Sequence, residues 1–225
     1  MIVRPLGTDP EAHRCFATGH LLHTIAMVFQ HDADLLRLAV QHYETAVSLQ
    51  GDAAWMVRNL GQGYAAMGRW DDAVRTYEKA LELLPRDAAL LSDAGVAWEH
   101  LGRHDRAVES YHAAIAADSG FAQAHNNLGY LLWKMGHVDD AIAAFRQAIG
   151  EQPTLAVAAY NLGVALEVKG LPEEAAVVWE SYLRSPLSDP QAQEWTKKIQ
   201  HGLSRLKTLT HQINPPPLAS LTNVR

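Results

Sequence analysis

The chain has 225 residues but only one cysteine, Cys15, so it forms no internal disulfide and requires no oxidising compartment. Long hydrophobic runs are also lacking. The best stretch, 21–29, contains His23 and Thr24 and falls far short of the ~20 residues that span a bilayer. It makes a weak leader as well, because Asp9 and Glu11 lie where a basic n-region belongs. We therefore expect a cytoplasmic protein.

Basic residues are in the minority. There are 19 Lys and Arg against 25 Asp and Glu, which gives a formal net charge of −6. Nucleic-acid binding needs clustered cations to neutralise phosphates, so no nucleic-acid partner is expected. The balance shifts near the end of the sequence, since no acidic residue follows Glu194 whereas five basic residues do.

Known catalytic motifs are missing: there is no Walker loop, no nucleophile elbow and no dinucleotide fingerprint. We expect no catalytic residue and no cofactor. The nearest approach to a metal site is His13-x-Cys15, followed by His20-x-x-His23 and His31. His13 and Cys15 are two residues apart, so they point in different directions on a helix, and we favour surface or packing roles over metal binding.

The chain has 15 glycines, and eight of them fall into two columns with a spacing of 34 residues. The first column is Gly61, Gly95, Gly129 and Gly163, and the second is Gly68, Gly102, Gly136 and Gly170. Two further columns in the same register are Ala73, Ala107, Ala141 and Ala175, and Tyr77, Tyr111, Phe145 and Trp179. A fixed period of this length indicates a repeat architecture.

Each repeat is interpreted as two antiparallel helices. In 54–87, Gly61 on the first helix lacks a side chain, so the second helix can approach closely and Tyr77 can fill the space between them. Gly68 is suited to end the first helix, where a positive φ is favoured. Pro85 ends the second helix because it lacks an amide hydrogen.

This pattern, Leu-Gly-x-x-Tyr and then Ala-x-x-x-Tyr/Phe-x-x-Ala before a proline, resembles the tetratricopeptide repeat (TPR). The resemblance implies an all-α fold, a right-handed α-solenoid of stacked antiparallel helix pairs with capping helices at both ends. Four units fit it, at 54–87, 88–121, 122–155 and 156–189.

The ends of the array are interpreted as caps. Counting back 34 residues predicts a second helix over 34–50 and places Met27 in the glycine column, so 1–53 is predicted to be an N-terminal cap with a degenerate repeat. After a start signal at 189–191, an apolar stripe predicts an amphipathic capping helix over 190–211. A Pro-containing flexible tail is expected over 212–225.

By the same resemblance, the first helices line a concave groove that binds a segment of a partner protein. The candidate binding residues are Trp55, Arg58, Asn59, Gln62, Asp93, Asn127, Tyr130, Trp133, Tyr160 and Asn161. Exposed aromatic side chains are typical anchors for protein partners, although two or more of these can instead pack between helices.

One column of this set holds Asn59, Asp93, Asn127 and Asn161. An asparagine amide both donates and accepts, so a row of them can hold a peptide backbone. The row is similar to the asparagine ladder of O-linked N-acetylglucosamine transferases, with Asp93 as a break. The alternative is that each asparagine bonds its own helix or a neighbouring turn.

The carboxylate clamp of chaperone co-factors, another TPR binding mode, is rejected. It needs Lys and Arg at groove positions that here hold Ala89, Gln123 and Val157, or the asparagine column. Without cations, a buried terminal carboxylate would be unpaired.

The expected function is therefore that of a non-enzymatic protein-interaction scaffold or adaptor, with a role in complex assembly. Two alternatives remain. In one, the basic C-terminal helix and tail mediate self-association or membrane contact. In the other, the N-terminal His and Cys residues bind a metal.

Overall fold

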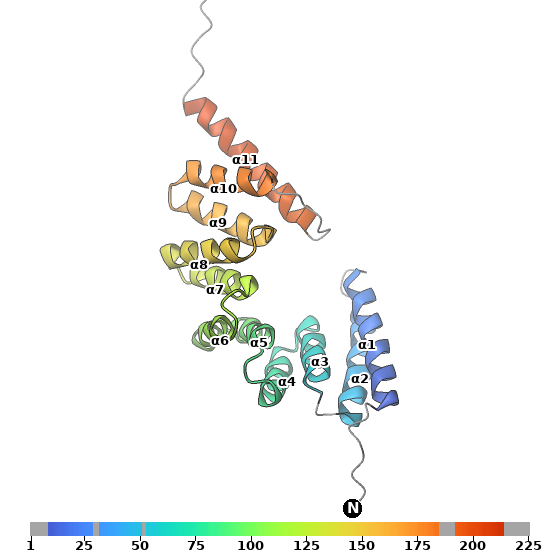
Figure 1. Cartoon of the computed structure of the whole chain (residues 1–225). Coiled ribbons are helices and arrows are strands. Elements are labelled where there is room, and N and C mark those ends of the chain that lie inside the picture. Colours follow the sequence, from blue (N-terminus) through green and yellow to red (C-terminus); the bar gives the residue numbers. More distant parts are fainter. Residues whose placement is uncertain (1–8, 29–31, 51–52, 185–191, 214–225) are drawn as a thin grey trace, which may run out of the picture. The chain divides into compact units, whose positions relative to one another are not determined.

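The computed structural model describes residues 9–28, 32–50, 53–184 and 192–213, and within them every regular element is an α-helix. Figure 1 shows these helices in chain order. The chain divides into two compact units, one within 1–131 and the other within 132–225. Each unit is described by itself.

The first unit holds three helix pairs and most of a seventh helix. Their bounds are α1 Pro10–Val28, α2 Ala33–Leu49, α3 Ala54–Ala66, α4 Trp70–Leu83, α5 Ala88–His100, α6 His104–Ala117 and α7 Ala122–Lys134, the last of which runs into the second unit. Each of α1 to α5 packs against the next helix in the chain. In addition, α3 contacts both α1 and α5, so the first helices of these three pairs are neighbours.

The second unit holds α8 Val138–Glu151, α9 Ala156–Val168, α10 Pro172–Arg184 and α11 Ala192–Ile213. Ile199, Leu203 and Leu206 on α11 are buried in the same core as Leu162 and Trp179. α11 contacts both α9 and α10, the packing expected of a C-terminal capping helix. The predicted start signal at 189–191 and residues 214–225 of the predicted tail lie outside the described residues.

The fold is thus an all-α solenoid of helix pairs, as the 34-residue columns predict. The rings of Tyr77 and Tyr111 lie directly against Gly61 and Gly95, where a Cβ would overlap them. In the second column, Gly68 has a φ of +71°, a left-handed conformation that favours glycine, and it ends α3.

The prediction for the first pair was wrong at one position. The ring of Tyr43 lies against Gly19, not against Met27, with 3.0 Å between Tyr43 Cδ1 and the place of a Gly19 Cβ. The reason is the length of α1, which continues for nine residues beyond Gly19, whereas α3 ends five residues beyond Gly61. Counting back by 34 therefore misplaces the glycine by eight residues, about two helical turns.

Candidate partner-binding surface

The predicted binding residues are divided between the two units. The first unit holds Trp55, Arg58, Asn59, Gln62, Asp93, Asn127 and Tyr130, and the second holds Trp133, Tyr160 and Asn161. Within the first unit they lie on α3, α5 and α7, and the neighbouring helices α3 and α5 bring several of them into direct contact.

Asp93 on α5 is the centre of a polar cluster with two residues of α3. Arg58 Nε lies 2.8 Å from Asp93 Oδ2 and forms an ion pair with it. Gln62 Nε2 donates a hydrogen bond of 3.0 Å to the same oxygen. The Arg58 and Asp93 side chains are 32% and 26% exposed, so the cluster is partly shielded from water yet open on one side.

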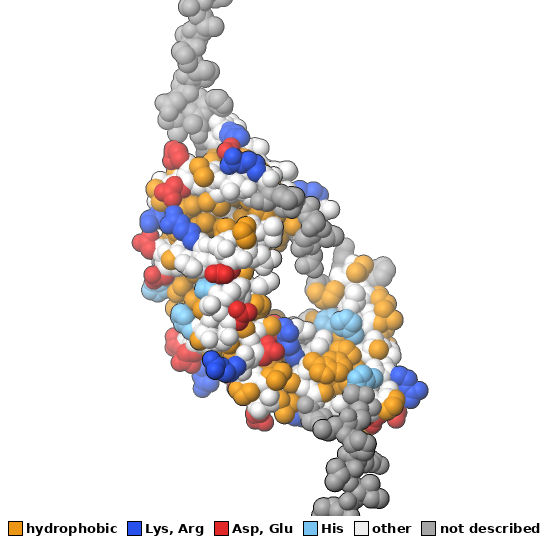
Figure 2. Space-filling view, in the orientation of Figure 1, with side chains coloured by type: hydrophobic (Ala, Val, Ile, Leu, Met, Phe, Trp, Pro, Cys, Tyr) orange, Lys and Arg blue, Asp and Glu red, His pale blue; other side chains and the backbone are white. Residues whose placement is uncertain are grey.

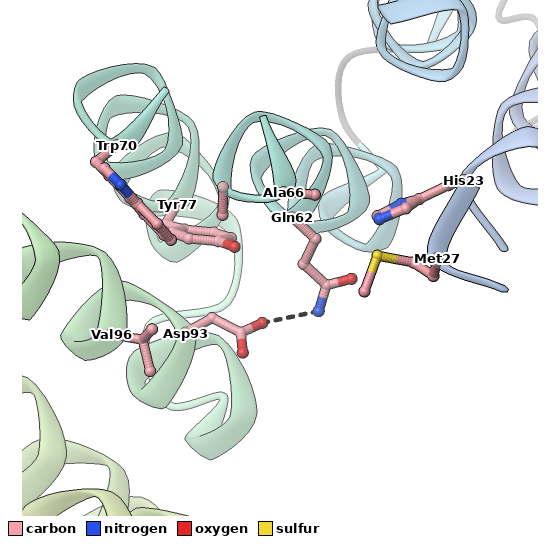
Figure 3. Close-up of a pocket in the computed structure, with 9 residues that line it drawn as sticks. His23, Met27, Gln62, Ala66, Trp70, Tyr77, Asp93 and Val96 are labelled. Carbon is pink, nitrogen blue, oxygen red and sulfur yellow. Dashed lines mark hydrogen bonds between the residues drawn. The ribbon is translucent and has the colours of Figure 1, made fainter. Parts of the chain in front are cut away.

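A cavity of about 610 Å³ opens beside this cluster, entirely within the first unit. Figure 3 shows the residues that line it. They are His23 and Met27 of α1, Gln62, Ala65 and Ala66 of α3, Trp70 and Tyr77 of α4, and Asp93 and Val96 of α5. Apolar walls with a few polar groups are typical of binding pockets in this size range.

Tyr77 supplies one of those polar groups. Its side chain is only 2% exposed, and its ring is held against Gly61. Burial raises the pKa of Tyr77 above its ordinary value, with a further rise from the nearby Asp93 carboxylate and an opposing effect of Arg58. The hydroxyl is therefore neutral at physiological pH and can both donate and accept.

Aromatic side chains on the candidate surface differ in exposure. Trp55 is 44% exposed, although its ring meets Phe16 of α1 edge-on with 4.4 Å between centroids. Figure 2 shows histidine side chains beside hydrophobic ones over this part of α1 and α3. Tyr130 is 42% exposed. Trp133 packs on the second unit's core, and Tyr160 lies 5.3 Å from Trp195 of α11 between ring centroids, so these two are partly covered.

The asparagine column is used in part inside the chain. Asn59 Nδ2 donates to the backbone oxygen of Trp55, four residues earlier on its own helix, at 2.7 Å. Asn127 Nδ2 donates to Ser92 Oγ at 3.3 Å. Asn161 lies half-buried on α9. Asn127 Oδ1 also accepts from Asn126 Nδ2 at 3.3 Å. A peptide backbone at Asn127 would therefore have to use its second N–H or the remaining lone pair of its oxygen.

The N-terminal histidines have separate surroundings. His13 Nδ1 lies 3.1 Å from the backbone oxygen of Asp9, His20 stacks on Phe16, and His23 Nδ1 lies 3.5 Å from the Tyr43 hydroxyl. Cys15 is half-buried and packs beside the core of α1, α2 and α3. No group of three or more metal-ligating side chains occurs among the described residues, and His31 lies outside them.

The basic residues of α11 are largely paired with acids. Arg205 Nη2 lies 2.7 Å and 2.6 Å from the two carboxylate oxygens of Glu167 on α9. Lys207 pairs with Glu180 of α10 at 3.0 Å, and Lys198 pairs with Glu194 at 2.8 Å. The pairs of Arg205 and Lys207 join α11 to α9 and α10, whereas that of Lys198 lies within α11. In the part of the chain that the structure describes, no helix is long and apolar enough to cross a membrane.

His23, Met27, Trp70 and Tyr77 line the cavity but were not among the predicted binding residues. The repeat pattern predicts only a packing role for Tyr77, between the two helices of its pair. For His23 the sequence suggests only a possible metal ligand. The additional turns of α1 shift the 34-residue register, so counting back from α3 does not place His23 beside it. A glycine eight residues before the expected position, Gly19, was the signal that could have corrected it.

Helix pairs joined at glycine contacts, with neighbouring first helices and a covering C-terminal helix, define an α-solenoid protein of the TPR type. A family model for the tetratricopeptide repeat matches residues 58–122 and 126–189, more than half of the chain. The chain belongs to the tetratricopeptide repeat family.

Solved structures share the fold at low sequence identity. MamA is similar with a TM-score of 0.60 and 20% identity over 93% of this chain and 98% of its own. TTC0263, a thermophilic TPR protein of Thermus thermophilus, has a TM-score of 0.67 and 16% identity over 86% of this chain and 99% of its own. YrrB, described as a TPR protein with an unusual peptide-binding site, has a TM-score of 0.56 and 21% identity over 86% and 92%. No curated protein matches the chain.

Proposed function

We propose that this protein is a non-enzymatic interaction scaffold that binds a polypeptide segment of a partner on the surface of its first helices, and that it assists assembly of a complex. The cavity between α1, α3, α4 and α5 carries the proposal, because it combines apolar walls with hydrogen-bonding groups. The exposed ring of Trp55 adds an aromatic anchor on the first helix α3. Membership of the TPR family and the peptide-binding site named for YrrB support it. A cytoplasmic location remains a prediction from the sequence.

The ten predicted residues have different roles in this proposal. Arg58, Gln62 and Asp93 form the polar edge of the cavity, and Trp55 and Tyr130 supply exposed aromatic area. Asn59, Asn127 and Asn161 remain proposed contacts to a peptide backbone. Trp133 and Tyr160 are proposed to contribute only through the parts of their rings that stay accessible.

Selection from a library of random 12-residue peptides displayed on phage tests the proposal. We expect peptides that bind the full chain and lose about 10-fold in affinity when Trp55→Ala removes the aromatic anchor. Lys79→Ala is the matched control, since Lys79 is exposed on α4 and does not line the cavity. Thermal melts of both variants confirm that the fold is retained.

Two outcomes contradict the proposal. One is that no peptide is selected. The other is that every selected peptide binds Trp55→Ala and Lys79→Ala as tightly as the unmodified chain. A separate measurement with Asn161→Ala tests the asparagine column, where the loss of one backbone hydrogen bond should weaken binding by about 0.5–1.5 kcal/mol.

A further inference from the structure

The cavity in the first unit presents oxygen atoms whose hydrogen-bonding capacity is not used within the chain. Tyr77 is almost completely buried, yet its hydroxyl makes no hydrogen bond to any described residue. Figure 3 shows this hydroxyl directed toward the side of the cavity where Gln62 lies. Because Tyr77 lines the cavity, its hydroxyl is available to a ligand there as donor or acceptor.

Gln62 and Asp93 also line the cavity and carry further oxygens. Asp93 receives both of its hydrogen bonds, from Arg58 and Gln62, on Oδ2, and within the described part of the chain Oδ1 accepts none. A carboxylate only accepts, so Gln62 must turn its NH₂ group toward Asp93, which leaves Oε1 as the other end of that amide. The cavity therefore offers acceptors from three helices: Tyr77 on α4, Gln62 on α3 and Asp93 on α5.

The walls around these oxygens are apolar. Met27, Ala65, Ala66, Trp70 and Val96 contribute carbon and sulfur surface. Residues 1–131 contain ten Lys and Arg against 16 Asp and Glu, which gives a formal net charge of −6. Residues 132–225 contain nine of each. The net charge of the first unit therefore favours a cationic ligand. The whole net charge of the protein thus belongs to the unit that carries the cavity.

We propose that this cavity binds a lysine side chain of the partner segment, with the aliphatic stem against Trp70 and Val96 and the ammonium on the oxygens of Tyr77 and Asp93. The proposal rests on the proposed function above. An ammonium carries donors and no acceptor, which suits acceptor oxygens that are not used within the chain, and a four-carbon stem covers apolar walls while its charge meets polar groups.

Arginine fits the cavity less well. A guanidinium pairs best with both oxygens of a carboxylate, and Asp93 Oδ2 is already bonded to Arg58 and Gln62. An anionic side chain fits worst, because Arg58 is the only cation that the described residues place at this polar cluster, and it is paired with Asp93. Lysine and arginine side chains have similar lengths. The site therefore discriminates between them by the acceptor atoms that are not already bonded within the chain.

The test uses peptides selected on the full chain and synthesised in pairs, with lysine in one member and norleucine in the other. Norleucine keeps the apolar stem and lacks the ammonium. Tyr77→Phe removes only the hydroxyl, and Phe145 occupies the same column of the repeat, so the fold tolerates this ring. We expect Tyr77→Phe to weaken the lysine peptide about 10-fold and to leave its norleucine partner unchanged.

Tyr111→Phe is the matched control, because Tyr111 holds the same column position but its hydroxyl donates to Glu99 at 3.3 Å and does not line the cavity. It should leave both peptides unaffected. Asp93→Asn should also weaken the lysine peptide selectively, with thermal melts to confirm that loss of the Arg58 pair has not unfolded the unit.

Selected peptides that depend on Trp55 but show no lysine preference, or that bind Tyr77→Phe normally, overturn the lysine proposal and leave the proposed function standing. A complete lack of binding peptides contradicts the proposed function itself. Self-association of the chain that Tyr77→Phe abolishes, measured by light scattering, would make a second copy the occupant and would also overturn the assignment to a partner segment.

Discussion

The indole Nε1 of Trp179 donates a hydrogen bond of 3.1 Å to the backbone oxygen of Ala159, deep in the second unit. Trp179 stands in the column that holds Tyr77 and Tyr111 in the first unit, and its larger ring reaches two glycines. It lies against Gly163 of α9 on one side and Gly202 of α11 on the other. One side chain thus joins α10 to both of its neighbours.

This arrangement predicts that Gly163→Ala is strongly destabilising. The added Cβ would overlap the Trp179 indole, and overpacking of this kind typically costs about 1–3 kcal/mol. Gly150→Ala is the matched control, since Gly150 lies exposed near the end of α8 with nothing within 4 Å of an added Cβ. It should stabilise the chain by up to about 1 kcal/mol, because alanine favours helix more than glycine does. Urea unfolding of both variants measures the difference, and equal midpoints would contradict it.

For Tyr182 we predict the opposite result: the substitution Tyr182→Phe does not destabilise the chain. Its hydroxyl is buried and has no hydrogen-bond partner among the described residues, in a position of the repeat where the other units hold Ala80, Ala114 and Ala148. Tyr182→Phe keeps the ring and removes the unsatisfied group, so we expect the free energy of unfolding to stay the same or to rise by about 1 kcal/mol. Tyr111→Phe, which loses the bond to Glu99, should instead lower it by about 0.5–1.5 kcal/mol. A loss at Tyr182 as large as that at Tyr111 would show that its hydroxyl has a partner after all.

The ion pair of Arg205 with Glu167 is predicted to contribute to docking of α11. The Glu167 side chain is only 16% exposed, so its carboxylate is less screened by water than a surface acid. A double-mutant cycle of Glu167→Gln and Arg205→Met, read by chemical unfolding, should give a coupling energy of about 1 kcal/mol. Additive effects of the two substitutions would contradict a direct interaction.

Much of the fold could be predicted from the sequence because glycine and large aromatic residues meet at a fixed spacing. Gly61 with Tyr77 and Gly95 with Tyr111 each join two helices of one pair, so 34-residue columns carry the packing itself. The 34-residue spacing predicts a wrong glycine position only in α1, where additional helical turns precede α2. Two residues of the cavity lining, His23 and Met27, lie on those turns, so the spacing does not predict them either.

The internal bonds of the candidate site were harder to predict, because they connect different columns. Arg58 bonds Asp93, and Ser92 bonds Asn127, so each contact joins a residue to one 35 positions later. The first contact is an ion pair and the second a neutral hydrogen bond, although the two positions are related by one repeat. A column of similar residues shows that positions are equivalent. It does not show which neighbouring column satisfies their polar atoms.

Buried tyrosines make the stability of the first unit sensitive to alkaline pH. Burial raises the pKa of Tyr43 to about 12, above its value near 10 in an unfolded chain. Below pH 10 the hydroxyl is protonated in both states and the contribution to stability is fully present. As the pH rises from about 10 to 12, the unfolded chain releases this proton before the folded chain does, so stability falls.

Tyr43→Phe should therefore reduce the loss of stability between pH 9 and pH 11.5, measured as the urea midpoint by circular dichroism. If Tyr43→Phe and the unmodified chain lose stability equally over this range, burial of the Tyr43 hydroxyl is not a cause of alkaline unfolding.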